Sequence, residues 1–257
     1  MNFDNHLRKK FKEQRKVIGT WNTLSSVVAT EVMSSSGLDF QIIDFEHGPF
    51  SLDNVHLHVN ACKLNKCSPI VRLPKLEDWM VLQALDQGAD GVLVPHINSK
   101  KDAMDLVKFS KYFPQGNRGF TPFAKAGNFS DINLKNHLKR SGETILGIII
   151  ESEEGLENLD EILTVKEIDF IYFGAYDISQ ALGYPGDVRH ATVLKKITHA
   201  ISKVNKSNKV AGGFIARNES DLNWLVNIGI NLVTFELDSL ALFERFNHIS
   251  NYFDQFR

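Results

Sequence analysis

The chain of 257 residues is poor in cysteine, has no long apolar run, and carries charges that nearly cancel. Two cysteines, Cys62 and Cys67, are too few for a disulfide framework or a zinc knuckle, and we expect both thiols to be reduced. The longest apolar run, ILGIII, is far too short to span a bilayer, and no apolar segment follows the basic N-terminus as it would in a secretory signal. These absences argue against secretion and membrane insertion and favour a cytoplasmic protein.

Other missing features exclude further classes of protein. Lys and Arg total 29 against 31 for Asp and Glu, so no whole-protein field attracts nucleic acid or an anionic membrane. No GxGxxG follows the first apolar run and no GxxxxGK[ST] occurs, so dinucleotide-binding and P-loop functions lose their main support. No linker rich in Pro, Ser or Gly divides the chain, which predicts a single domain over 1–257.

The pattern that recurs is a short β-branched run, then a turn, then a helix-like stretch. Three separate stretches have helical periodicity: 24–33, 79–85 up to Gly88, and 222–226 up to Gly229. Glycine just after the last periodic residue is a common helix stop. Eight such units in about 250 residues predict an α/β fold, a single (β/α)₈ TIM barrel, with a leading helix in 1–14 and a C-terminal helix in 239–257. The eight predicted strands are 17–21, 40–45, 69–73, 91–95, 145–151, 170–174, 210–214 and 232–236.

Active sites of such barrels lie at the carboxyl ends of the strands, so polar residues that end an apolar run are the candidates. Glu151 follows ILGIII directly, and Asp177 follows the next predicted strand. Two carboxylates from adjacent strand ends suit Mg²⁺ or Mn²⁺, which keep water ligands that a substrate can displace. The alternative for Asp177 is a capping acid in the first turn of a helix. The strand-end residues are Trp21, Asn22, Asp44, Glu46, His47, Arg72, His96, Glu151, Asp177, Glu236 and Asp238.

His47 and Arg72 are the candidates for acid–base and charge chemistry. Asp44 lies three residues before His47, and a carboxylate near a histidine can orient it as a general base. Arg72 could neutralise a developing oxyanion, or it could form a salt bridge to Glu46 or another acid at the rim. His56 and His58 share a predicted helix but not a face of it, which indicates structural roles.

The longest irregular stretch, 114–129, combines Arg118 and Lys125 with Phe120 and other phenylalanines. Loops of this length in a compact domain are usually functional or disordered. We expect an ordered loop over the site, with a mobile loop as the alternative.

Several ordered motifs make the chain resemble the HpcH/HpaI family of metal-dependent pyruvate aldolases over roughly residues 15–245. They are GTWNTLSS, IIDFEHGPF, VRLP, GADGVLVPHINS, FPQGNRGF, IIIESEEGLENLDEIL and IYFGAYDISQALGYPGD. Each motif alone is weak, but their order and spacing together are specific.

The resemblance implies a role for each matching residue. Glu151 and Asp177 match the metal ligands, for Mg²⁺ or Mn²⁺ first and Co²⁺, Ni²⁺ or Zn²⁺ as alternatives. His47 matches the catalytic histidine with Asp44 as its orienting acid, and Arg72 matches the arginine that contacts the keto oxygen of pyruvate. The remaining expected substrate contacts are Trp21 and the backbone of Gly174, Ala175 and Tyr176; the candidates for the aldehyde side are His96, Arg118, Phe120 and Lys125.

The implied activity is reversible aldol cleavage or condensation of a 2-oxo acid such as pyruvate with an aldehyde, sugar-derived aldehydes included. Two alternatives stay open: a citrate-lyase-like acyl-CoA lyase or phosphoenolpyruvate-handling enzyme, and a catalytically impaired homologue that binds metal or ligand. The resemblance also implies a homo-oligomer, a hexamer built as a trimer of dimers, with the C-terminal helix as a candidate interface.

The chain departs from the family's usual residues at four single positions and in the last predicted strand, where VTFELD replaces a glycine-containing VAVGxD pattern. Phe45 replaces a common glycine, Ile149 a common glutamine, and His96 an apolar residue, while Tyr176 adds a phenol in the GAYD segment. Because residues two apart on a strand face the same way, Ile149 removes a polar group from the side of the barrel that carries Glu151. These changes in the pocket predict that the substrate can differ from those typical of the family.

Overall fold

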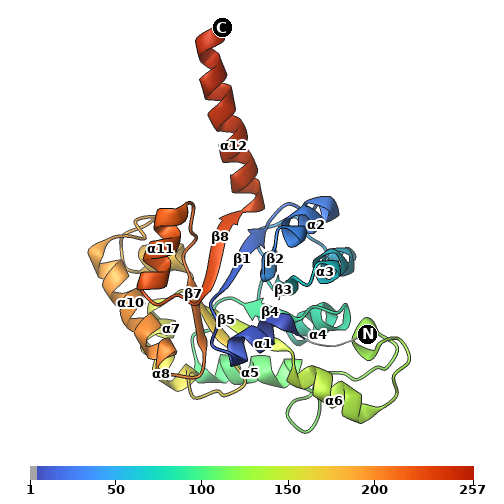
Figure 1. Ribbon diagram of the computed structural model, residues 1–257. Coiled ribbons are helices and arrows are strands. Elements are labelled where there is room, and N and C mark those ends of the chain that lie inside the picture. Colours follow the sequence, from blue (N-terminus) through green and yellow to red (C-terminus); the bar gives the residue numbers. More distant parts are fainter. Residues whose placement is uncertain (1–4) are drawn as a thin grey trace.

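The computed structural model describes residues 5–257, and within them eight parallel strands close into a barrel in sequence order (Figure 1). Each predicted strand is present, with ends that differ from the prediction by one residue at most. The single (β/α)₈ barrel is confirmed. The strands are β1 Val17–Asn22, β2 Phe40–Asp44, β3 Ser68–Arg72, β4 Gly91–Val94, β5 Ile145–Ile150, β6 Phe170–Phe173, β7 Val210–Gly213 and β8 Leu232–Leu237.

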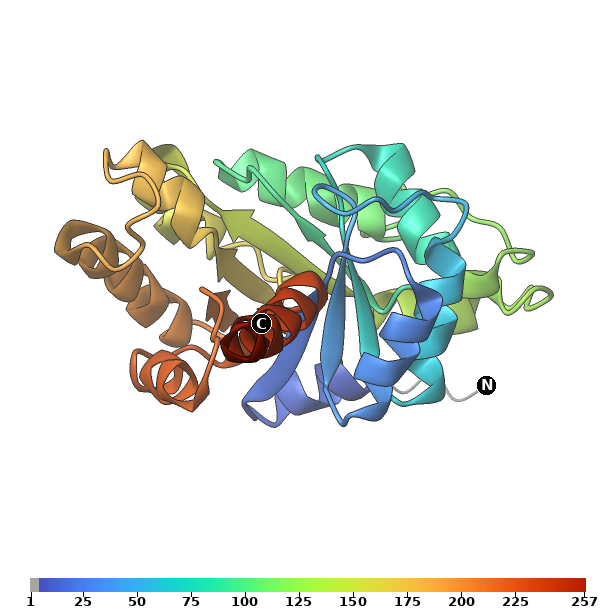
Figure 2. The ribbon, with the colours of Figure 1, turned by 90° about the horizontal axis from the view of Figure 1, so that it is seen from above.

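Helices surround the strands when the molecule is seen from above (Figure 2). The predicted periodic stretches become α2, α4 and α11. Of the predicted leading helix 1–14, residues 6–12 form α1, and residues 1–4 lie outside the described residues. The predicted C-terminal helix 239–257 corresponds to α12 and η2. The helices are α1 His6–Lys12, α2 Val27–Ser35, α3 Val55–Leu64, α4 Asp78–Asp86, α5 Lys100–Ser110, α6 Leu134–Gly142, α7 Glu153–Glu157, α8 Leu159–Ile162, α9 Ala175–Ala181, α10 Ala191–Asn205, α11 Glu219–Asn227 and α12 Asp238–Phe253, with 3₁₀ turns η1 Lys125–Gly127 and η2 Asp254–Phe256.

Alternation along the strands divides the core into two parts. On β5, Ile148 and Ile150 pack outward against the helices, whereas Ile149 faces the barrel interior. On β6, Phe173 joins the outer layer, and Tyr172 joins the interior with Ile149. Because both faces of a parallel sheet are covered, the strands read as continuous apolar runs, which is why the sequence reveals them.

Asp238 ties the seam between β8 and β1. Its carboxylate accepts hydrogen bonds from the backbone N–H groups of Thr23 (2.8 Å) and Leu24 (2.9 Å) and from the Thr23 hydroxyl (2.7 Å). Those N–H groups are thereby taken out of α2, which begins at Val27 with Ser26 as its cap, rather than at Leu24 as the periodicity predicts. From Asp238, α12 projects away from the barrel at the carboxyl ends of the strands (Figure 1).

The opposite end of the barrel is covered by α1. Leu7 is fully buried, and Arg8 donates to the carboxylate of Asp169 and to the carbonyl of Thr144, both at 2.6 Å. No helix within residues 5–257 has the length and apolar character needed to cross a membrane.

His58 is the titratable member of a buried polar cluster between α2, α3 and β2. Its Nδ1 lies 2.7 Å from the Thr30 hydroxyl, which in turn accepts from the side-chain amide of Asn22. His58 is fully buried, and desolvation lowers the pKa of its imidazole below the usual 6.5, against a smaller raising effect of Asp238. This confirms the structural role expected of His58, whereas His56 on the same helix is exposed.

Protonation of His58 should therefore destabilise the fold. The folded pKa lies below the unfolded one, so the unfolded chain binds more protons and the free energy of unfolding falls as the pH drops below about 6.5. In urea unfolding between about pH 7 and about pH 5, we expect His58→Gln to lose less stability than the wild type. His56→Gln, the matched control, should keep the wild-type slope, and equal slopes for all three proteins would contradict this reasoning.

Candidate active site at the carboxyl ends of the strands

Glu151 is held at the end of β5 by the turns on either side of it. The loop between β4 and α5 is joined to β5 by a hydrogen bond from the Ile97 N–H to the Ile149 carbonyl (3.3 Å). Ser152 caps α7 and donates to the amide oxygen of Asn98 (2.5 Å). The turn that carries Glu151 is therefore fixed to the neighbouring turn, and the carboxylate stands at the barrel mouth as predicted.

His96 is the direct partner of the Glu151 carboxylate. One carboxylate oxygen accepts the His96 backbone N–H at 2.8 Å and lies 2.7 Å from its Nδ1, while Nε2 lies 3.5 Å from Glu46. His96 has a left-handed backbone (φ 57°), which turns both its N–H and its ring toward Glu151. The imidazole thus lies between two acids, from β2 and from β5.

The carboxylate of Glu151 is in an unfavourable environment for a negative charge. Only 6% of the residue is exposed. Desolvation raises its pKa; the His96 N–H and ring and Arg72 lower it, and the nearby Asp177 charge raises it further. Burial and a second acid together make this position one that a cation would stabilise.

Arg72 is buried at the end of β3 and paired with two acids. It lies 3.3 Å from the Asp44 carboxylate and forms an ion pair with Glu46. Its guanidinium also lies over the ring of Trp21, 5.2 Å from the centroid. The salt bridge to Glu46 weighed from the sequence is present, and it fixes the cation at the mouth.

Asp44 orients the backbone before His47 rather than the imidazole itself. One of its carboxylate oxygens accepts the N–H groups of Glu46 (3.0 Å) and His47 (3.2 Å), and the other faces Arg72. The His47 side chain is exposed at the mouth. The expected carboxylate–imidazole contact is therefore replaced, in this structure, by a carboxylate that holds the turn carrying His47.

The floor of the mouth is aromatic. The indole N–H of Trp21 donates to the Tyr172 hydroxyl (3.2 Å), and the two rings meet edge to face. The hydroxyl donates to the Phe214 carbonyl (2.9 Å) and lies 2.9 Å from Thr234 Oγ1, which links three strands beneath the charged groups. Sequence reasoning missed Tyr172, although its place two residues after the inward Phe170 was an available signal.

Gly174 gives Glu151 its space. A Cβ at position 174 would lie 2.8 Å from Glu151 Cβ and 3.0 Å from Oε2, so the carboxylate would have to move. Gly174 is also the N-cap of α9, whose first turn contains the exposed Tyr176 and Asp177. Backbone N–H groups of a first turn have no acceptor within their helix and can bind an anion.

The residues fit a cation with an incomplete protein shell. Across residues 5–257, no three His, Cys, Asp or Glu side chains gather in an arrangement that holds a metal ion by themselves. Glu151 and Asp177 supply two hard oxygen donors whose mutual repulsion a divalent cation would relieve. Two protein oxygens suit an ion that completes its coordination with water and substrate oxygens.

Three residues that were expected to contact the aldehyde lie away from the barrel mouth. Arg118 pairs with Asp86 at the end of α4 (2.5 Å), and Lys125 donates to the amide of Asn60 on α3. Phe120 packs against His137 on α6, 4.5 Å between ring centroids. The segment that leads into α6 lies toward the amino ends of the strands, at the lower right of Figure 1 and away from α12, so the expectation that 114–129 covers the mouth of its own barrel is wrong. Of the four, only His96 lies at the mouth.

Known proteins resemble this chain in sequence and in fold. The family model described as HpcH/HpaI aldolase/citrate lyase matches residues 17–240. The chain is 30% identical to the hydroxypyruvate/pyruvate aldolase of Roseovarius nubinhibens, with 88% of each chain covered. It is 29% identical to the 5-keto-4-deoxy-D-glucarate aldolase of Shigella boydii, covering 95% of this chain and 97% of the relative. A crystal structure of a citrate synthase superposes with a TM-score of 0.88 at 26% identity, covering 98% of each chain.

Gly174→Ala should weaken binding of a divalent cation, because the new methyl group displaces the Glu151 carboxylate. We expect the dissociation constant for Mn²⁺, measured by calorimetry, to rise about tenfold or more. Gly142→Ala on α6 is the control, since a Cβ there has no heavy atom within 4 Å among the described residues. Equal Mn²⁺ affinity in the wild type and Gly174→Ala would show that Glu151 is not a ligand.

Proposed function

This chain belongs to the HpcH/HpaI aldolase/citrate lyase family, and we propose that it is a divalent-metal-dependent aldolase, a carbon–carbon lyase that joins a 2-oxo acid to an aldehyde and cleaves the product. The observation that carries this proposal is the gathering of Glu151, Arg72 and His47 at one barrel mouth, with Asp177 acting on Glu151. The names of the relatives support pyruvate or hydroxypyruvate as the 2-oxo acid.

Glu151 and Asp177 would hold the metal, for which Mg²⁺ and Mn²⁺ fit two carboxylate oxygens best, with Co²⁺, Ni²⁺ and Zn²⁺ as further candidates. When bound, the ion supplies Lewis acidity toward the oxygens of the 2-oxo acid. The chain itself supplies the second cation, Arg72, whose position is fixed by Asp44 and Glu46.

Substrate binding then follows from the charges at the mouth. Arg72 would donate to the keto oxygen, where negative charge develops as the enolate forms. The N–H groups at residues 174–176 would bind the carboxylate at the start of α9. Trp21, stacked beneath the Arg72 guanidinium, and the inward Ile149 would form an apolar floor that excludes water from the reacting carbon.

His47 would move the proton. In condensation it takes a proton from the carbon next to the keto group, directly or through a water molecule, and that carbon attacks the aldehyde carbonyl. The aldehyde oxygen becomes a hydroxyl by accepting a proton, so the base is restored at the end of the cycle. In cleavage the same residue takes the hydroxyl proton, the carbon–carbon bond breaks, and the proton returns to the enolate carbon.

The acyl-CoA alternative has lost the observation that favoured it. Within one chain, Arg118 and Lys125 lie at the far end of the barrel and cannot bind a nucleotide at this mouth. The fit to a citrate synthase structure supports carbon–carbon bond formation by the fold but does not select a CoA ester. Two alternatives remain, a phosphoenolpyruvate-handling enzyme and a homologue that binds ligand without turnover. The exchange experiment below separates the second of these from an aldolase.

The wild-type protein should exchange the methyl protons of pyruvate with deuterium oxide when Mg²⁺ or Mn²⁺ is present, as followed by proton NMR. Glu151→Gln should abolish this exchange, because the metal site loses a charged oxygen. His47→Ala should slow it by about 10² or more, the usual contribution of a general base. Binding of pyruvate without exchange in the wild type would instead indicate an impaired homologue.

Two exposed residues provide controls for the exchange assay. Glu153→Gln removes an acid of α7 that pairs with Lys196 at 2.8 Å, outside the mouth, and His56→Ala removes an exposed imidazole of α3. Both should exchange at the wild-type rate. A panel of aldehydes, including sugar-derived ones, with the same proteins then identifies the acceptor.

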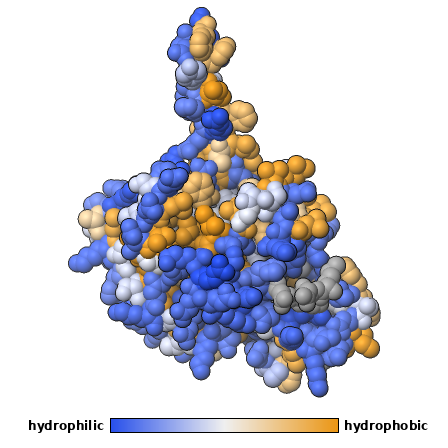
Figure 3. All heavy atoms as spheres, in the orientation of Figure 1, coloured by the Kyte–Doolittle hydropathy of each residue, from blue (hydrophilic) through white to orange (hydrophobic). Residues whose placement is uncertain are grey.

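We also infer that α12 mediates assembly of a homo-oligomer. The helix extends beyond the barrel with apolar side chains facing solvent (Figures 1 and 3), and Phe243 and Phe246 are 65% and 66% exposed. An apolar stripe of this kind on a projecting helix is typical of an interface. A hexamer built as a trimer of dimers remains our proposed oligomeric state.

We further propose a cytoplasmic location, which the buried, free thiols of Cys62 and Cys67 support because thiols stay reduced in that compartment.

Phe243→Asp combined with Phe246→Asp should dissociate the oligomer, because each change places a charge in the apolar contact. Light scattering after gel filtration should give a smaller mass than the wild type. Lys195→Asp, at an exposed position of α10, is a control for added negative charge. A wild-type monomer, or a variant that keeps the wild-type mass, would contradict the role of α12.

A further inference from the structure

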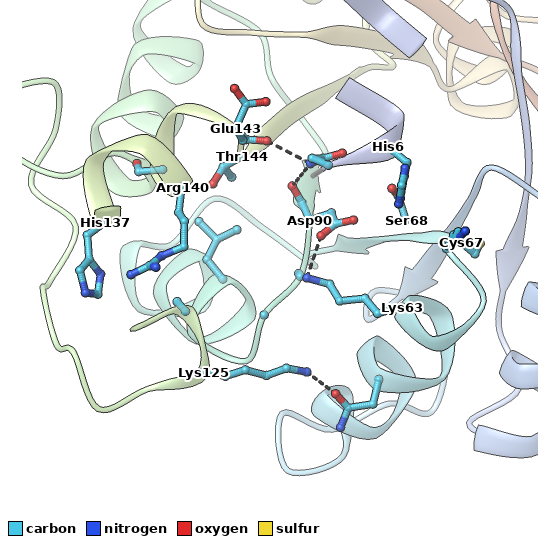
Figure 4. Close-up of a pocket in the computed structure, with 18 of the residues that line it drawn as sticks. His6, Lys63, Cys67, Ser68, Asp90, Lys125, His137, Arg140, Glu143 and Thr144 are labelled. Atoms are coloured by element: carbon cyan, nitrogen blue, oxygen red, sulfur yellow. Dashed lines mark hydrogen bonds and ion pairs between the residues drawn. The ribbon is translucent and has the colours of Figure 1, made fainter. Parts of the chain in front are cut away.

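A second cavity lies at the opposite end of the barrel from the proposed active site. It has a volume of about 660 Å³ and opens between the end of α3, the start of β4, η1 and α6 (Figure 4). Its apolar floor includes Leu85 and Tyr112. Nothing in the proposed aldol reaction uses this space, and its chemistry is the reverse of the acidic mouth.

Cationic side chains outnumber acids in the lining. The five cations are Lys63, Lys66, Arg118, Lys125 and Arg140, and the two acids are Asp90 and Glu143. Asp90 pairs with Lys63 at 2.8 Å, and Glu143 pairs with Lys12 at 3.2 Å, outside the cavity lining. Arg118 and Arg140 pair with Asp86 and Asp131, which are not part of the lining. Within residues 5–257, no carboxylate lies within ion-pair distance of Lys66 or Lys125, so these two lysines give the described part of the cavity a positive charge.

Buried polar atoms of the lining also lack partners. His137 is fully buried; its Nε2 donates to the Asp131 carbonyl, while Nδ1 has no hydrogen-bond partner among the described residues. The Ser141 hydroxyl and the Nε of Arg118, both in residues more than nine-tenths buried, are likewise without hydrogen-bond partners in the described part of the chain. These three polar atoms are buried in the wall of the cavity, where buried polar groups normally have partners.

Lys125 occupies an unfavourable position that an anion would relieve. Its stem packs beside Gly88, and its ammonium group donates to Asn60 (Figure 4). Desolvation, and then the nearby Lys63, lower the pKa of Lys125 to about 8. A negative charge placed between the two lysines would offset both effects.

We propose that this cavity binds a small organic anion that carries at least two carboxylate or phosphate groups. Lys63, Lys66 and Lys125 would bind its charged groups. Leu85 and Tyr112 would contact its carbon skeleton. The site is separate from the aldolase proposal, which neither requires it nor depends on it.

Calorimetric titration of the full-length protein, without divalent metal, tests the site with two probes: inorganic pyrophosphate and propane-1,2,3-tricarboxylate. We expect saturable binding of at least one probe, with one molecule bound per chain. The tighter probe then identifies phosphate or carboxylate as the preferred group. Absence of saturable binding by both probes would overturn the proposal.

Variants locate the bound probe. Lys125→Met removes the charge but keeps an unbranched stem beside Gly88, and we expect it to raise the dissociation constant about tenfold or more. Lys66→Met changes an exposed residue of the rim and should act in the same direction, so that the test does not rest on the folding of one variant. Lys195→Met removes the same charge from an exposed position on α10 and should bind like the wild type. Binding that is unchanged in both Lys125→Met and Lys66→Met would place the probe elsewhere and overturn the assignment.

Discussion

The carboxylate of Glu151 is buried at the end of β5, and the other charges of the barrel mouth are arranged around it. A buried carboxylate is costly unless it is hydrogen-bonded and neutralised. The protein supplies one backbone N–H and one imidazole, both from His96, while Asp177 adds a like charge. The compensation inside the chain is therefore incomplete, which is the physical reason that this end of the barrel suits a cation.

Arg72 does not complete that compensation, because its own charge is shared by Asp44 and Glu46. The two pairs fix the guanidinium in a direction set by β2 and β3, and the Trp21 ring closes it from below. An arginine held in this way needs little reorganisation when an oxyanion forms next to it. The same acids that position Arg72 also connect, through Glu46 and His96, to the Glu151 carboxylate, so the proposed metal and oxyanion sites form one network.

The fold could be predicted from the sequence because its determinants are local. Continuous apolar runs mark the eight strands, and polar residues that end those runs mark the mouth; Glu151, Arg72 and His47 are placed as predicted. The pairing of His96 with Glu151 depends on a left-handed backbone conformation at His96. No sequence pattern predicts that conformation at a residue other than glycine. The predicted position of 114–129 is wrong because composition shows that a loop is basic and aromatic, but does not show which end of the barrel the loop covers.

The nearly neutral net charge combines two ends of the barrel that differ in charge. The acids Asp44, Glu46 and Glu151 gather at the carboxyl ends of the strands, and Lys66 and Lys125, which have no carboxylate partner within residues 5–257, lie at the amino ends. An acidic mouth admits a 2-oxo acid only where Arg72 and a bound cation offset the acids, and it repels ligands with several negative charges. A polyanion is instead attracted to the lysine-lined cavity. The two sites lie at opposite ends of the barrel, so a ligand of one site does not compete for the other.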